Sequence, residues 1–164
     1  MTAAASSTTK TVHVKITRRA LQAMQKDIAQ YPFVETGGLL LGRQDGDTLT
    51  VYQMVDGGQT YAKREKASFC YDYGYVQQQT DKICAWYKPE IGVIGVWHKH
   101  NCIGGDRPFS DADEIIHMQL LQKAEQSVLS ILFESDKNTS ACQMRTFVLQ
   151  TDFNHICVEA EIIE

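Results

Sequence analysis

Apolar side chains alternate with polar ones along some segments of the chain and recur every three or four residues along others. Alternation, or a short continuous apolar run, is the pattern of a β-strand, whereas the longer spacing is the pattern of an amphipathic helix. We therefore expect strands at residues 11–17, 35–42, 48–55, 91–96, 128–134, 142–150 and 156–163. We expect helices at residues 18–30, 76–87 and 110–125.

The order of these segments predicts an α/β fold in which helices flank a mixed sheet. Strands precede and follow each predicted helix, and neither a repeat nor an internal linker interrupts the chain. A chain of 164 residues is long enough for one well-packed core. We expect a single domain over residues 11–164, preceded by a small, polar and disordered leader over residues 1–10.

Composition narrows the classes of partner. A formal net charge of -4 gives no basic surface for nucleic acid. No apolar run approaches the length of a transmembrane helix, and the first residues lack the apolar core of a secretory signal. We expect a cytoplasmic protein that binds neither nucleic acid nor membranes.

The five cysteines are odd in number and widely separated, and they form no Cys-x-x-Cys pair. This pattern predicts reduced thiols rather than a disulfide framework or a thiolate zinc site. Cys102 lies two residues after His100. The others fall in apolar or strand-like surroundings, where cysteine behaves as a small hydrophobe: Cys70, Cys84, Cys142 and Cys157.

Two histidines, His98 and His100, follow the apolar strand over residues 91–96. Side chains two apart on a strand point to the same face with backbones roughly 6.6 Å apart, so both imidazoles can reach one metal ion. Asp113, arriving from the next helix, would add a third ligand and leave one tetrahedral position open, as in catalytic zinc sites. An H-x-H pair alone is weak evidence, since a histidine at a strand end is usually only hydrogen-bonded.

Ser110 and Asp113 also have a purely structural interpretation. Ser-x-x-Asp before an apolar helical run resembles a capping box, in which the two residues satisfy each other's backbone N–H groups. Such a box would fix the first turn of the helix and the direction of the Asp113 side chain. The capping role is therefore compatible with a role in a metal site.

Two other metal-binding families use an H-x-H pair, but the residues that follow the pair in this chain do not match their patterns. The metallo-β-lactamase pattern requires Asp and His where this chain has Cys102 and Ile103. A cupin requires Glu where this chain has Gly104 and Gly105. Neither pattern describes the sequence.

Taken together, five residues resemble the JAMM motif of the JAB/MPN metalloprotease family, which consists of a distant upstream Glu, H-x-H, a short loop and S-x-x-D. The five are Glu35, His98, His100, Ser110 and Asp113. Residues 35–42 and 95–98 are also similar to the family's Glu-bearing and histidine-bearing strands, and the resemblance covers roughly residues 11–135. It implies a three-layer, cytidine-deaminase-like fold with a mixed central sheet.

The chain departs from the family pattern in the loop after the histidines. The family commonly has Pro where this chain has Asn101, and a loop of seven residues where residues 101–109 make nine. Because loop length varies among prokaryotic members, we interpret the difference as altered substrate contact.

The resemblance implies a role for each of these residues. His98, His100 and Asp113 would bind one zinc ion per chain, although nitrogen and carboxylate ligands also accept other divalent ions. Glu35 would be the general base that activates the attacking water and returns its proton to the leaving amine. Zinc and the Ser110 hydroxyl would stabilise the tetrahedral oxyanion.

The resemblance further implies a deubiquitinase-like isopeptidase of the prokaryotic branch. It would hydrolyse the bond after the C-terminus of a ubiquitin-like protein, for deconjugation or precursor processing, in a bacterial ubiquitin-like conjugation or antiphage defence system. Two alternatives stay open: a sulfur-carrier processing peptidase or small-molecule amide hydrolase, and a non-catalytic MPN-type binding module.

Residues near the predicted site leave further questions open. His117 lies one helical turn after Asp113 and would close the site if it were a fourth ligand. The thiolate of Cys102 could occupy the open position instead. Three alternating tyrosines, Tyr71, Tyr73 and Tyr75, could contact an extended substrate tail or simply pack.

Overall fold

A computed structural model describes residues 11–124, 126–136 and 142–164. Along the chain, its elements are β1 (His13–Thr17), α1 (Arg18–Gln30), β2 (Thr36–Asp45), β3 (Thr48–Asp56), β4 (Lys63–Arg64), β5 (Phe69–Cys70), α2 (Tyr73–Trp86), β6 (Gly92–His100), α3 (Asp111–Ala124), β7 (Val128–Ser135), β8 (Cys142–Leu149), β9 (His155–Cys157) and β10 (Ala160–Ile163). The predicted leader, residues 1–10, lies outside the described residues.

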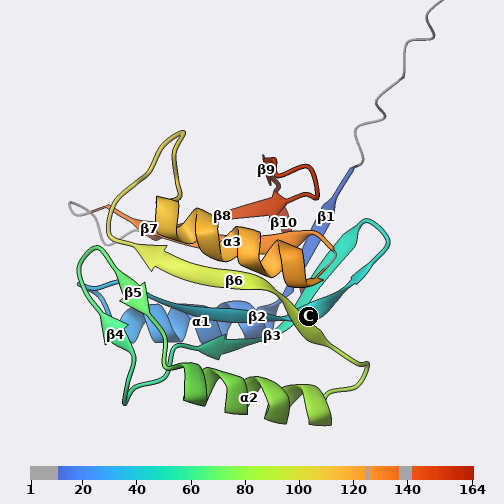
Figure 1. Ribbon diagram of the computed structural model, residues 1–164, viewed down its shortest axis with the longest axis horizontal. Helices are drawn as coiled ribbons and strands as arrows, with labels where there is room; N and C mark the ends of the chain where they lie inside the picture. Colours follow the sequence, from blue (N-terminus) through green and yellow to red (C-terminus); the bar gives the residue numbers. More distant parts are fainter. Residues whose placement is uncertain (1–10, 125, 137–141) are drawn as a thin grey trace, which may run out of the picture.

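Eight strands form one curled mixed sheet in the order β10-β1-β3-β2-β6-β7-β8-β9 (Figure 1). β2 is antiparallel to both β3 and β6, whereas β6 is parallel to β7. β9 and β10 lie at opposite ends of this order although only Val158 and Glu159 separate them in the sequence. The sheet therefore has to curl until its two edges come close together. The expected mixed α/β architecture is confirmed.

Helices cover both faces of the sheet, with α1 behind β2 and β3 and with α3 in front of β6 and β7 (Figure 1). Side chains along β2 point alternately to the two faces of the sheet. Leu40 packs in one apolar cluster with Met24 of α1. Leu39 and Leu41 pack in a second cluster with Val76 of α2. Because both faces of β2 are buried, its sequence is a continuous apolar run rather than an alternation of apolar and polar residues.

Helix α2 and the last predicted strand differ from the sequence prediction. α2 begins at Tyr73 rather than residue 76, because the Asp72 side chain caps it by accepting a hydrogen bond from the Tyr75 backbone N–H at 3.1 Å. The last predicted strand is two strands, because the chain leaves the β8 edge at Val158 and joins β1 at the other edge. The predicted helix end at Glu125 lies outside the described residues.

The cysteine prediction was also partly wrong. All five thiols are free, but Cys70, Cys142 and Cys157 are exposed, as is Cys102, and Cys84 is half-buried. Cys70 and Cys157 lie on the short strands β5 and β9, Cys142 is the first residue of β8, and Cys102 follows β6 in a loop. Among the helices of the described residues, none is long and apolar enough to cross a bilayer.

Candidate metal centre

The two histidines lie within β6 rather than beyond its end, because pairing with β7 continues to His100 opposite Glu134. Strand alternation puts both imidazoles on one face, with ring centroids 4.5 Å apart. Both are nearly buried, at 9% exposure for His98 and 8% for His100. On the neighbouring strand Gly37 pairs with His98, and a Cβ there would lie 2.8 Å from the His98 Cβ, so only glycine permits this approach of β2 to β6.

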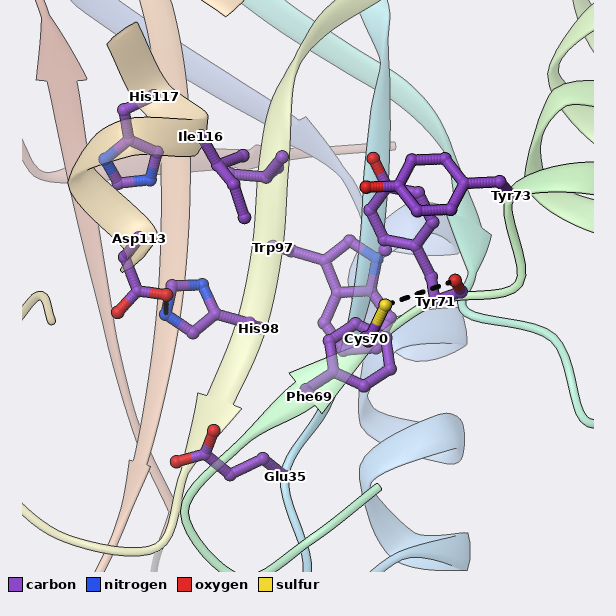
Figure 2. Close-up of a pocket in the computed structure, with 12 residues that line it drawn as sticks. Glu35, Phe69, Cys70, Tyr71, Tyr73, Trp97, His98, Asp113, Ile116 and His117 are labelled. Atoms are coloured by element: carbon purple, nitrogen blue, oxygen red, sulfur yellow. Dashed lines mark hydrogen bonds and ion pairs between the residues drawn. The ribbon is translucent and has the colours of Figure 1, made fainter. Parts of the chain in front are cut away.

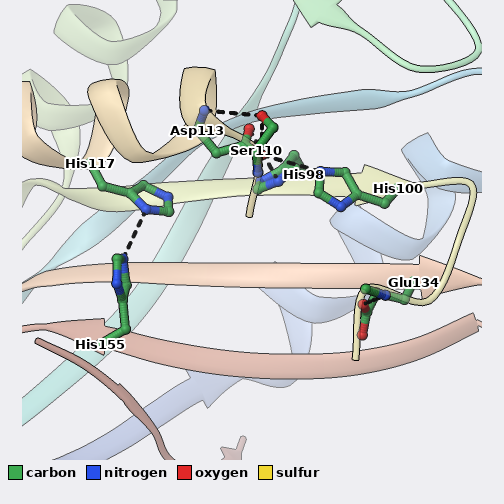
Figure 3. Close-up of polar contacts among 8 residues, drawn as sticks. His98, His100, Ser110, Asp113, His117, Glu134 and His155 are labelled. Carbon is green, nitrogen blue, oxygen red and sulfur yellow. Dashed lines mark hydrogen bonds and ion pairs between the residues drawn. The ribbon is translucent and has the colours of Figure 1, made fainter. Parts of the chain in front are cut away.

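Asp113 reaches the same face from the first turn of α3, where the predicted capping box is confirmed (Figure 3). The Ser110 N–H donates to Asp113 Oδ2 at 2.8 Å, and the Asp113 N–H donates to Ser110 Oγ at 3.3 Å. The Ser110 hydroxyl also donates to Asp113 Oδ2 at 2.8 Å. The box holds the carboxylate in one direction, toward the histidines.

One ligand atom from each of His98, His100 and Asp113 lies within 4.8 Å of the others. Among the described residues, these three make the only such group of histidine, cysteine or carboxylate ligands. His98 Nε2 lies 3.5 Å from Asp113 Oδ1, and His100 Nε2 lies 3.4 Å from Asp113 Oδ2. Ligand atoms about 2.0–2.2 Å from one tetrahedral zinc ion lie about 3.3–3.6 Å from each other. Both His–Asp distances fall in this range, one to each Asp113 oxygen, so the group could hold a metal ion.

The polar groups of this cluster support the same conclusion. His98 Nε2 is buried without a hydrogen-bond partner, which costs free energy unless a ligand binds it. Burial alone would raise the pKa of Asp113, but the adjacent imidazoles of His100 and His98 hold it well below its ordinary value. Burial alone would lower the pKa of His100, but the Asp113 hydrogen bond and the Glu35 charge raise it. Asp113 is therefore a carboxylate, the form that binds metal.

Glu35 lies at the start of β2, beside the histidine strand. Thr36 pairs with Lys99 and Gly37 with His98. Glu35 comes one residue before Thr36, and it therefore lies level with His100. It lines a cavity together with His98 and Asp113, and Figure 2 shows its carboxylate on their side of β6. Burial raises the pKa of Glu35, although the nearby His100 opposes this. A half-buried carboxylate beside a metal-capable group is suited to proton transfer.

Side chains that the sequence analysis did not identify hold the segment before Glu35. The Lys99 ammonium, on the face of β6 opposite the histidines, donates to the carbonyl oxygens of Tyr31 and Pro32 at 2.8 and 3.0 Å. Asn101, the residue after β6, donates to the Phe33 carbonyl at 3.4 Å and to the Lys66 carbonyl at 2.8 Å. β6 thus carries both histidines together with Lys99, which holds the segment before Glu35. The sequence signal for this structural role was the position of Lys99, a lysine within an otherwise apolar strand.

Replacing Lys99 by Met should lower the free energy of unfolding by about 2–3 kcal/mol, because the carbonyls of Tyr31 and Pro32 lose the charged donor that the buried Lys99 provides. Urea unfolding measures the change. Lys82→Met, at an exposed position of α2, is the control and should change stability by less than about 0.5 kcal/mol. Equal stability of the two variants would contradict a structural role for the Lys99 contacts.

Neither alternative ligand belongs to the metal-capable group. His117 does not belong to the metal-capable group, and its Nδ1 lies 3.2 Å from His155 Nε2. Cys102 is exposed and is not in the group either. Tyr71 and Tyr73 line the cavity beside the group, whereas Tyr75, on α2, packs against the apolar cluster that contains Leu39 and Leu41 of β2.

The long loop over residues 101–109 is bound to β7 and β8 by two charged residues that the sequence analysis missed. The carboxylate of Glu134, which is 1% exposed, accepts a hydrogen bond from the Gly104 N–H at 2.7 Å. Arg145 donates to the Gly105 carbonyl at 3.0 Å and also lies 3.4 Å from the Glu134 carboxylate. The loop therefore has fixed contacts next to the metal-capable group.

Comparison with known proteins gives one curated relative and a structural neighbour. No family model matches the chain. It is 31% identical over 98 residues to the probable metalloprotease y4qB of Sinorhizobium fredii, covering 58% of this chain and 59% of that protein. The match thus spans about three fifths of the relative's length.

Among solved structures, protein DSY2949 from Desulfitobacterium hafniense matches with a TM-score of 0.61 and 18% identity. The alignment covers 92% of this chain and 93% of that one. At this identity the similarity concerns the fold.

Proposed function

We propose that this chain is a metal-dependent peptidase of the JAMM type with the JAB/MPN fold. The observation that carries the proposal is the group of His98, His100 and Asp113 within 4.8 Å, with the Glu35 carboxylate lining the same cavity. The similarity to a protein named a probable metalloprotease supports the same class of reaction.

His98, His100 and Asp113 would hold the ion, with zinc as the proposed metal. Two neutral imidazoles and one carboxylate are a ligand set of catalytic zinc sites, and three protein ligands leave a position open. When bound, such an ion supplies Lewis acidity, which polarises a carbonyl group and makes water more acidic.

Glu35 is the proposed general base and acid. Its carboxylate takes a proton from the attacking water and returns it to the leaving amine, so that an amide bond is hydrolysed without a covalent enzyme intermediate. Burial raises its pKa, which makes the protonated form more accessible near neutral pH. A raised pKa makes the Glu35 carboxylate a stronger base toward water and keeps its protonated form available to the leaving amine.

Ser110 is the proposed donor to the oxyanion. Its hydroxyl proton is directed at Asp113 Oδ2, and it becomes available to a substrate once that oxygen has another partner. The Ser110 backbone N–H would continue to hold Asp113. The capping and catalytic roles are thus both possible for the same side chain.

Ser110→Ala separates these two roles. Loss of the cap should lower the free energy of unfolding by about 1 kcal/mol, and loss of the oxyanion donor should lower kcat about 10²- to 10³-fold. Ser110→Thr keeps the hydroxyl and should retain most of both. Steady-state kinetics and thermal unfolding measure the two effects, and a Ser110→Ala enzyme with full kcat would leave only the capping role.

We further propose that the substrate is the C-terminal tail of a ubiquitin-like protein, joined to a partner or to a short extension. The cavity supports an extended tail, because it joins the metal-capable group to an apolar side lined by Phe69, Tyr71, Tyr73 and Ile116. A bacterial ubiquitin-like conjugation or antiphage defence system is the proposed setting.

The test incubates zinc-loaded protein with a ubiquitin-like protein encoded beside its gene and fused through its C-terminus to a test partner. Mass spectrometry follows cleavage with and without a chelator. Cleavage at the junction that stops with chelator and returns with zinc supports the proposal. Cleavage of small amides alone would indicate an amide hydrolase, and binding without cleavage would indicate a binding module.

A further inference from the structure

The cavity contains a second histidine whose polar atom has no partner. His117 is 1% exposed and lines the same cavity as His98 and Glu35. Its Nε2 is buried without a hydrogen bond. A bound ion would satisfy His98 Nε2, but His117 is not in the metal-capable group. The unpaired His117 nitrogen therefore requires another partner.

Neighbouring rings fix the orientation of His117, and Figure 3 shows its contact with one of them, His155. Its Nδ1 lies 3.2 Å from His155 Nε2, on β9. Phe109 packs edge-on against His117, with ring centroids 4.7 Å apart, and against His155 at 5.1 Å. With Nδ1 engaged by His155, the ring presents Nε2 away from β9, as a preset polar contact beside the apolar Ile116 in the cavity lining.

His117 is uncharged under ordinary conditions. Burial, together with the nearby His98 and His155, lowers its pKa to about 3. In a neutral imidazole one nitrogen donates and the other accepts, and the contact with His155 uses Nδ1. If His155 donates, His117 Nε2 carries a proton that suits a carbonyl oxygen; in the reverse case it accepts an N–H. A peptide group offers both.

We propose that His117 Nε2 hydrogen-bonds a main-chain peptide group of the bound substrate, with His155 as the residue that positions the ring. The inference rests on the proposed peptidase function and adds a specificity contact that the five-residue motif lacks. It identifies the substrate as one that continues as peptide beyond the reacting bond, rather than a small amide.

The distance along α3 indicates which peptide group makes the contact. His117 follows Asp113 by four residues, which is about 6 Å along a helix axis. An extended peptide advances about 3.4 Å per residue. The contact should therefore fall on the first or second peptide group from the metal-capable group.

The experiment compares two metal-binding probes with the zinc-loaded protein. Acetohydroxamic acid binds a metal ion through its hydroxamate alone, whereas N-acetylglycylglycine hydroxamate adds two peptide groups to the same anchor. Calorimetry gives the ratio of the two affinities for the wild type, His117→Asn and His117→Gln. The glutamine amide reaches the position of Nε2, while the asparagine amide reaches only that of Nδ1.

We expect the affinity ratio to fall about three- to tenfold in His117→Asn and to be largely retained in His117→Gln. Acetohydroxamic acid should bind all three proteins equally. In the wild type, the ¹⁵N resonance of His117 Nε2 should move with the longer probe and not with the shorter one. An unchanged ratio in His117→Asn, or an unmoved resonance, would overturn the inference.

These outcomes are separate from those for the proposed function, because hydrolysis is not measured. A protein that binds the longer probe through His117 but cleaves no peptide would retain the contact and lose the peptidase proposal. If the wild type cleaves the fusion substrate but His117→Asn leaves the affinity ratio unchanged, the peptidase proposal is retained and the His117 contact is lost.

Discussion

Replacing Glu35 by Gln lowers the rate of amide hydrolysis by about 10²- to 10⁴-fold, the usual contribution of a positioned general base. Glutamine has nearly the same shape, so it can occupy the half-buried site at the start of β2. It cannot accept and return a proton. Because Glu35 is not in the group of metal ligands, the variant should keep its zinc.

The measurement pairs kinetics with metal content. Glu65→Gln is a matched control, since Glu65 is an exposed carboxylate whose backbone carbonyl pairs with the Glu35 N–H at 2.7 Å. It should retain wild-type rate and zinc. An undiminished rate in Glu35→Gln would show that another group acts as the base, whereas loss of zinc would show that Glu35 is a ligand.

Replacing Asp113 by Asn weakens zinc binding by more than about 100-fold, beyond the effect usual for removing an outer-shell partner. The amide keeps the size of the side chain and an oxygen that can accept the Ser110 N–H, so α3 remains capped. It loses the charge that the two histidines face at 3.5 and 3.4 Å. Hydrolysis should be lost together with the metal.

Competition with a coloured chelator measures the affinity, and thermal unfolding with and without zinc provides a second measure. A metal that binds only the folded protein raises its stability, and this gain should disappear in Asp113→Asn. Asp111→Asn, at an exposed position in the same helical turn, should keep the gain. If Asp113→Asn bound zinc as tightly as Asp111→Asn, the proposed ligand set would be wrong.

Local sequence patterns predict the elements and the motif residues best. The bounds of α1 follow from helical spacing and from the Tyr31-Pro32 stop, and they agree with the structure. The shared face of His98 and His100 follows from strand alternation, and the direction of Asp113 follows from the Ser110 cap, both of which are local.

Features that depend on distant parts of the chain were not predictable in the same way. β9 and β10 have the pattern of one strand, and only the curl of the sheet assigns them to opposite edges. The partner of His117 is His155, 38 residues away, and the partner of Glu134 is the backbone of Gly104. No spacing rule links such residues, because their proximity results from the packing of the whole sheet.

A crystal structure of the zinc-loaded protein, with anomalous scattering measured at the zinc edge, tests the central claim most directly. The account predicts one ion per chain, bound by His98 Nε2, His100 Nε2 and an Asp113 oxygen at about 2.0–2.2 Å. The Glu35 carboxylate should face the position that these ligands leave open. An ion bound elsewhere, or one whose fourth position is filled by a protein atom, would contradict the account.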